Sequence, residues 1–192
     1  MIQLQVQNTL APIPGRLLLA EPFMLEEVFS RSIIYLCKHD AEGSFGFVLN
    51  KIIPWSISDI LPDFPLKEME IHEGGPVCPE QLYYLHTKGE LFSNCELLEN
   101  GLFMGGDYKE LLENVKIDAI ASKDIRFFVG YSGWSKGQLE QEIKAKSWLV
   151  VDKLDINEIM NCKNEEDWKQ IMKRQGSVHK KMTDFPKNPT NN

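Results

Sequence analysis

The stretch that decides the fold is IRFFVGYSGWSKGQLEQE, residues 125–142. Its first part, Ile125–Tyr131, is a short apolar run typical of a central β-strand. Glycines follow, and Ser135 with Gln138 forms a capping-box pattern that opens a helix. Leu139 and Ile143, four residues apart, give that helix a buried face. The stretch therefore predicts a strand, a glycine-rich turn and a helix in succession.

Similar apolar runs occur on both sides of this stretch. Residues 32–38 and 45–49 flank a glycine-containing turn, which is the pattern of a buried β-hairpin. Further strands are expected at 15–20, 82–86, 102–104 and 148–151, and helices are expected to begin near residues 56, 107 and 164. Strands and helices intermingle without a regular βαβ period. We therefore predict an α+β fold with a mixed, largely antiparallel β-sheet and flanking helices.

The domain organisation follows from where these patterns begin and end. We expect an N-terminal extension over residues 1–14 and a single domain over residues 15–176. Gly176 is the expected stop of the helix that Asn164 caps. Residues 177–192 hold three lysines, two prolines and almost no apolar side chains, so we expect a flexible polar tail there.

Charge and cysteine content indicate the protein's surroundings. The 21 basic and 28 acidic residues give a net charge of −7, which makes direct nucleic-acid binding unlikely. The four cysteines lack the spacing of a zinc site. The N-terminus lacks a signal-peptide pattern, and no apolar run approaches the ~20 residues of a membrane helix. We expect a cytoplasmic protein without a membrane contact, a metal or a cofactor.

The glycine-rich turn allows two interpretations. A strand that ends in glycines before a capped helix offers free backbone N–H groups and the positive end of a helix dipole, which is the basis of an anion site. The alternative is a tight turn whose glycines adopt positive φ, with Trp134 packed over it. The P-loop pattern is absent, which argues against a nucleotide P-loop. On spacing alone the tight turn is favoured, because glycines that open helices are common. Trp134 is the one tryptophan expected to contact a ligand or partner.

Other chemistry has weaker support. A metal site would need several of the four histidines to converge, and surface or capping roles are favoured for them. Ser132 misses the nucleophile-elbow pattern by one residue, although it could meet His39 or His86 in space. No catalytic residue is assigned from the sequence.

The sequence resembles the AlgH/YqgE family of bacterial proteins. The block Gly130–Glu142 looks like the signature of that family, and residues 45–51 and Gly74–Val77 look like two further blocks. Ser132 stands where the family commonly has Ala, and Ile52-Ile53-Pro54 adds apolar residues after the second block. The resemblance covers residues 15–176 and implies a compact α/β domain. It also implies a role described as transcriptional regulation, without an assigned biochemical activity and hence without transferable catalytic residues.

We therefore expect a regulatory or binding protein that acts through a small ligand or a protein partner and affects transcription indirectly. Its expected site is a cleft between two glycine-rich segments, formed by Asn50, Gly74, Gly75, Pro76, Tyr131, Ser132, Gly133, Trp134, Gly137 and Gln138. One alternative is an enzyme that acts on a small anionic metabolite, held at the helix start near Ser135. A second alternative is a DNA-binding regulator, which the charge and the absence of a basic recognition helix disfavour.

Overall fold

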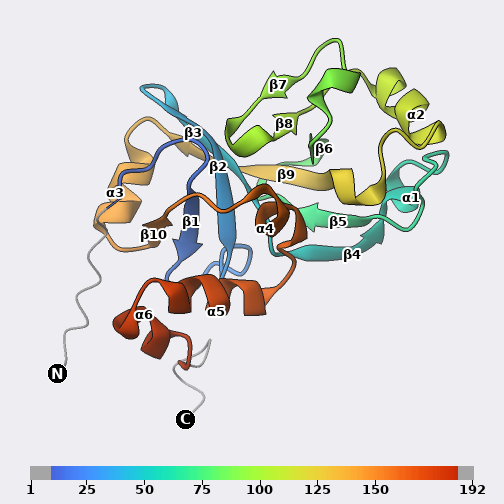
Figure 1. Ribbon diagram of the computed structural model, residues 1–192. Coiled ribbons are helices and arrows are strands. Elements are labelled where there is room, and N and C mark those ends of the chain that lie inside the picture. Colours follow the sequence, from blue (N-terminus) through green and yellow to red (C-terminus); the bar gives the residue numbers. More distant parts are fainter. Residues whose placement is uncertain (1–9, 186–192) are drawn as a thin grey trace.

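The computed structural model describes residues 10–185, which form a curled mixed β-sheet with helices around it (Figure 1). The strands are β1 (Leu17–Ala20), β2 (Ile33–Asp40), β3 (Gly43–Val48), β4 (Ile52–Ser56), β5 (Glu70–Glu73), β6 (Val77–His86), β7 (Glu96–Leu97), β8 (Phe103–Met104), β9 (Ile125–Ser135) and β10 (Trp148–Val151). The helices are α1 (Ile57–Ile60), α2 (Tyr108–Lys116), α3 (Gln138–Lys144), α4 (Ile156–Asn161), α5 (Glu165–Arg174) and α6 (Ser177–Met182). The predicted α+β class is confirmed.

Strand β9 is the centre of the sheet, whose order is β10-β1-β2-β3-β9-β6-β8-β7. On one edge β9 pairs antiparallel with β6. On the other edge it pairs with two strands in succession, parallel with β5 at Phe127–Val129 and antiparallel with β3 at Ser132–Ser135. The sheet therefore forks along β9, and β4 extends the β5 branch. Among the described strand pairs, β5 with β9 is the parallel one, and the others are antiparallel.

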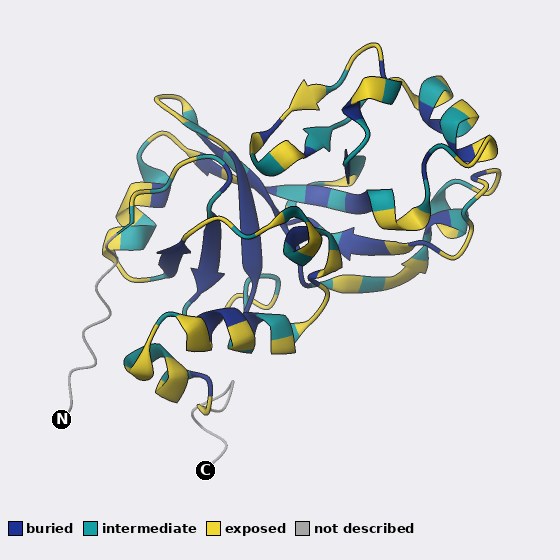
Figure 2. Cartoon of the chain, in the orientation of Figure 1, coloured by how far each residue is buried: buried dark blue, intermediate teal, exposed yellow. Residues whose placement is uncertain are grey.

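The β1–β3 branch is buried on both faces, which explains its continuous apolar runs. Leu17 and Leu19 face the cluster that contains Trp168 of α5, whereas Leu18 and Ala20 face the cluster that contains Leu139 of α3. A third cluster fills the space beneath α1 and α2, around Phe64 and Phe127. Figure 2 shows the resulting pattern, with buried central strands and exposed outer helix faces.

The structure differs from the predicted elements at several points. Helix α3 begins after Gly137, so Ser135 ends β9 and does not cap the helix. Ser135 N–H and Oγ instead donate to the Gln138 side chain, 3.0 and 3.1 Å away. Strands β4 and β5 and helix α4 were not expected. Helix α4 has its own capping box, Asp155 with Glu158.

Both chain ends also bear on the predicted domain limits. Residues 177–182 of the expected tail form α6, and the chain continues as far as Phe185, whose ring lies 5.4 Å from that of Phe23. The Arg31 guanidinium donates to the Phe185 carbonyl, which joins this segment to the domain. Residues 1–9 of the expected extension and residues 186–192 of the expected tail lie outside the described residues.

Candidate functional site

The two glycine-rich segments predicted to form a cleft meet at the fork of β9. Gly74 N–H donates to Val129 O over 2.9 Å, and Val48 N–H donates to Gly74 O over 2.9 Å. A Cβ on Gly75 would lie 2.4 Å from the Tyr131 carbonyl carbon, and one on Gly130 would lie 2.3 Å from Gly75 O. The segments thus contact each other backbone to backbone, because only glycine allows so close an approach. None of the four pockets described here in residues 10–185 is lined by Gly74, Gly75 or Pro76.

Ser132 and Asn50 are buried next to this fork and have intramolecular partners. Ser132 Oγ is inaccessible to solvent and donates to Gly74 O over 3.1 Å, a position that does not suit a nucleophile. Asn50 Oδ1 accepts from Ile33 N–H at 2.8 Å. Its Nδ2 donates to Arg31 O at 2.9 Å and to Asn164 O at 3.2 Å. Asn50 thus joins β2 to the start of α5, a structural role that the sequence did not indicate.

Trp134 belongs to the core on the α3 side of the sheet and is only 6% exposed. Its indole N–H donates to Glu142 Oε2 at 2.8 Å, and the indole N–H of Trp148 donates to the same oxygen at 2.7 Å. Gln138 Nε2 donates to Glu142 Oε1. Gly137 adopts φ 74° at the start of α3, and no atom would lie within 4 Å of a Cβ there. These contacts favour the tight-turn interpretation of the motif.

A shallow groove remains open beside the fork. Its volume is about 380 Å³, and Tyr131, Gly133 and Trp134 line one side of it. Phe45 and Val77 add apolar contacts, and Lys38, Asp40 and Glu42 add charges. This groove retains three of the ten predicted site residues. The prediction of a ligand site at the glycine-rich segments stays a prediction, with this groove as its available space.

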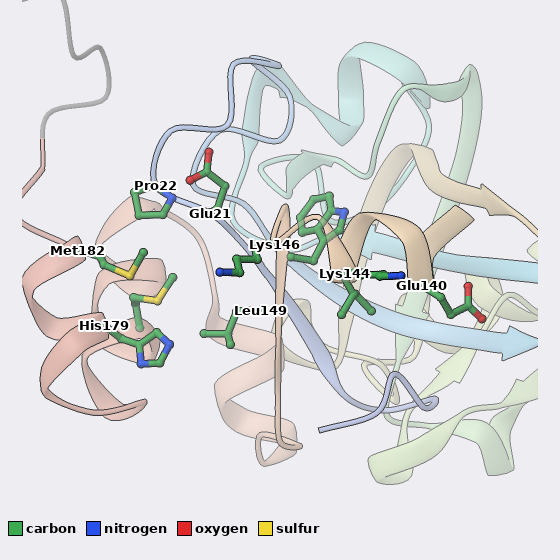
Figure 3. Close-up of a pocket in the computed structure, with 11 residues that line it drawn as sticks. Glu21, Pro22, Glu140, Lys144, Lys146, Leu149, His179 and Met182 are labelled. Atoms are coloured by element: carbon green, nitrogen blue, oxygen red, sulfur yellow. The ribbon is translucent and has the colours of Figure 1, made fainter. Parts of the chain in front are cut away.

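A more apolar pocket lies beside β10, between α3 and the C-terminal helices (Figure 3). Its volume is about 430 Å³. The apolar side chains that line it come from five segments and are Pro22, Ile143, Trp148, Leu149, Met172 and Met182. We call it the α6 pocket, because His179 and Met182 of α6 form its outer wall.

The polar groups of the α6 pocket lie mainly around its rim. Lys146 extends its amine toward the α6 side, while Glu140 lies at the opposite end (Figure 3). Burial raises the pKa of Glu21, which a hydrogen bond from the Phe23 backbone partly offsets. His179 Nδ1 lies 3.0 Å from Gln175 O, whereas its Nε2 is buried without a hydrogen-bond partner within residues 10–185. The pocket therefore combines apolar walls with one buried polar atom that has no hydrogen-bond partner within residues 10–185.

The histidines correct another expectation, because two of them are buried and not on the surface. His86 is fully buried and lies 2.9 Å from Gly105 O. His72 is 3% exposed and lies beside the guanidinium of Arg126, itself 4% exposed. Burial and the Arg126 charge lower the pKa of His72 to about 2. Within residues 10–185 no three His, Cys, Asp or Glu side chains converge as metal ligands.

Sequence reasoning missed Arg126 entirely. Arg126 is a charged residue inside the apolar run that predicted β9. This interruption of the run was the feature of the sequence that could have indicated a functional or structural role for Arg126. Its Nη2 donates to Leu49 O and Cys162 O at 2.6 and 2.7 Å, and its Nη1 donates to Ile159 O. A fully charged guanidinium thus lies among carbonyl groups where β9 meets the end of α4.

A family model described as AlgH-like matches residues 17–180 of this chain. The chain belongs to the AlgH-like family. A UPF0301 protein of Bacteroides thetaiotaomicron is 34% identical over 186 residues, covering 96% of this chain and 94% of the relative. The UPF0301 protein CT0663 of Chlorobaculum tepidum is 33% identical over 176 residues, covering 92% and 94%.

Two solved structures of this AlgH-like fold are similar to the chain. The crystal structure of protein DIP2367 from Corynebacterium diphtheriae has a TM-score of 0.73 at 24% identity, covering 92% of this chain and 94% of that one. The solution structure of AlgH from Pseudomonas aeruginosa has a TM-score of 0.71 at 23% identity, covering 95% and 98%. These likenesses establish the fold. In the described part of the chain, no helix has the length and apolar character needed to span a bilayer.

Proposed function

We propose that this AlgH-like protein is a ligand-binding regulatory protein whose ligand occupies the α6 pocket. The observation that carries the proposal is the buried Nε2 of His179, which lacks a partner in residues 10–185 and lines a largely apolar pocket. A buried polar atom without a partner costs free energy that a bound hydrogen-bonding group would recover. The volume of about 430 Å³ lies within the range of small-molecule sites.

The tautomer of His179 indicates the chemistry of the ligand. Gln175 O can only accept, so His179 Nδ1 carries the proton of a neutral ring and Nε2 presents a lone pair. A matching ligand has an apolar body for Ile143, Trp148 and Met182 and one hydroxyl or amide N–H for Nε2. The proposed ligand class is therefore a small apolar molecule with a single hydrogen-bond donor.

The position of the pocket supports a regulatory role. Its outer wall is α6, which the contacts of Phe185 with Arg31 and Phe23 join to the rest of the domain. A ligand that touches both α6 and β10 would favour one placement of the C-terminal segment. The net charge of −7 favours a protein partner over DNA as the recipient of this signal. All four cysteines are free, in keeping with the proposed cytoplasmic location.

A thermal-shift screen tests the proposal with small apolar alcohols and phenols, each paired with its methyl ether. A ligand at ~100 times its Kd adds about 2.7 kcal/mol of stability. We expect alcohols and phenols to raise the Tm and the ethers, which cannot donate to Nε2, to raise it much less. Met182→Trp fills the pocket and should abolish the shift. Lys181→Trp places the same side chain at an exposed neighbouring position on α6 and should preserve it.

Two results would count against the α6 pocket. Equal shifts in Met182→Trp and Lys181→Trp would remove the pocket as the site, and equal shifts from alcohols and ethers would remove the role of His179. Chemical-shift mapping by NMR would then locate the ligand. A footprint on Tyr131 and Gly133 would instead support the glycine-rich site predicted from the sequence.

A further inference from the structure

A second pocket, of about 670 Å³, lies where β5 and the start of β9 meet the end of α4. Figure 1 shows α4 in front of these two strands. We call it the Arg126 pocket, because the guanidinium that ties α4 to the sheet also lines it. None of the residues that line the α6 pocket lines this one.

Arg126 forms no ion pair with a carboxylate of residues 10–185. Its hydrogen-bond partners are backbone carbonyls and His72, whose ring nitrogens lie 3.1 and 3.2 Å from Nη2. The low pKa keeps His72 neutral, so it adds no charge. The carboxylates of Glu70 and Asp167 favour the charged form of Arg126, but neither forms an ion pair with it among the described residues. Burial of the charge is therefore costly, and an anion in direct contact would lower that cost.

The rim of the pocket adds to the positive potential. Lys67, Lys123 and Lys163 line it together with Arg126, against the two carboxylates of Glu68 and Glu70. Glu70 Oε2 lies 2.6 Å from Lys163 Nζ, an exposed pair that an anion could replace. This excess of positive charge stands out in a chain with a net charge of −7.

The remaining lining indicates the rest of the ligand. Ser122 and Asn161 offer polar side chains, while Leu66, Met69 and Met160 offer apolar ones. Several cationic groups and hydrogen-bond donors around one point suit a phosphate, which carries more charge and more acceptor oxygens than a carboxylate. The apolar side chains suit an organic group attached to it.

We propose that the Arg126 pocket binds a small organic phosphate, whose phosphate group lies among Arg126, Lys123 and Lys163. Glu70 holds Lys163 when the pocket is empty and releases it to the phosphate. The organic part lies against Leu66, Met69 and Met160. This proposal is independent of the α6 pocket and of its ligand, so either can fail alone.

Titrations by NMR with phenyl phosphate, inorganic phosphate and benzoate at low ionic strength test this. We expect phenyl phosphate to bind more tightly than the other two probes, since it alone combines the phosphate with an apolar group. Its footprint should include the Arg126 side-chain N–H and the backbone of residues 122–126. A footprint elsewhere, or no saturable shift with phenyl phosphate, would overturn the proposal.

Variants that change one exposed charge test whether Arg126 belongs to a binding site or has only a structural role. They leave Arg126 itself unchanged. Lys123→Gln should weaken the binding of phenyl phosphate about three- to fivefold, and Glu70→Gln should tighten it by a similar factor. Lys173→Gln removes one positive charge from the exposed side of α5, outside the pocket, and should leave the Kd unchanged. If Lys123→Gln and Lys173→Gln weaken binding equally, or if Glu70→Gln does not tighten it, only the general charge of the protein attracts the anion and the proposal fails.

Discussion

The middle of β9 and its N-terminal end are built in opposite ways. In the middle, Gly130 and Gly75 let two backbones touch, and the contact leaves no space between them. At the N-terminal end, Arg126 reaches across to the carbonyls of Ile159 and Cys162, and a pocket of about 670 Å³ remains beside it. The glycine contact is filled, whereas the end with a single unexpected charge borders open space.

This contrast shows why the glycine-rich motif occurs in this fold. Strands β3, β5 and β6 all approach β9 where the sheet forks, and a side chain there would collide with backbone. The glycines are required by strand packing, so they need no ligand to explain them. Open volume arises instead where elements distant in sequence meet, as β9 and α4 do at one pocket and β10 and α6 at the other.

The largest expected effect on stability concerns the close glycine contact in the middle of β9. Gly130→Ala places a Cβ 2.3 Å from Gly75 O at φ 64° and should destabilise the fold by roughly 3–5 kcal/mol. Gly137→Ala is the matched control, because it has a similar φ of 74° but open space, and should cost about 1 kcal/mol. Urea unfolding measures both. Similar losses in the two variants would mean that backbone strain, and not close packing, explains the glycines.

The next effect concerns the charged end and its pH dependence. The pKa of His72 falls from an ordinary 6.5 to about 2 in the folded protein. Below pH 6.5 the unfolded chain is therefore protonated at His72, whereas the folded chain is not. Stability should therefore fall as the pH falls, by about 1.4 kcal/mol per pH unit, or about 2 kcal/mol between pH 6.5 and 5. The lowered pKa of buried His86 acts in the same direction.

Unfolding by urea at several pH values measures this slope in wild type and in His72→Gln, which cannot take up the proton. The variant should show a flatter dependence over this interval. His39→Gln removes a histidine from the less buried end of β2 and serves as the control. An equal flattening in both variants would contradict the assignment to His72.

The smallest expected loss of stability concerns the fork of the sheet at β9. Ser132→Ala removes a buried hydroxyl that donates to Gly74 O, but this carbonyl still accepts from Val48 N–H. Because no buried acceptor loses its last partner, we expect a loss of only about 1 kcal/mol. The ligand-induced Tm shift should be unchanged. Loss of that shift in folded Ser132→Ala would restore the fork as a functional site.

The sequence predicted the core strands well because their physics is local. The runs at 32–38 and 45–49 became the β2–β3 hairpin, and Asp107 and Asn164 cap α2 and α5 through their side chains. Strands β4 and β5 were missed, since Ile52–Ser56 is an exposed edge with Pro54 and Glu70–Glu73 is half charged. They are strands only because β5 pairs with β9 and β4 pairs with β5.

The expected site could not be located in the same way, since its geometry depends on long-range contacts. A cleft between the two glycine segments was a hypothesis, because the sequence does not show whether the two turns face each other. Both their contact and the absence of space between them depend on long-range contacts of Gly74 and Gly75 with Val48, Val129 and Gly130. Asn50 was expected to line the ligand cleft, and in the structure it is a buried link to Asn164. The capping box of α4, Asp155 with Glu158, was readable in the sequence and would have predicted this helix, although not its contact with Arg126.

The central position of β9 has a consequence for how the chain is made. Its partners β3, β5 and β6 all precede it in the sequence, so during synthesis they emerge before the strand that joins them. Until residue 135 has left the ribosome, the facing edges of these strands lack their native neighbour and can pair with other chains. The fold therefore depends on pairing between strands distant in sequence, which generally forms more slowly than local pairing.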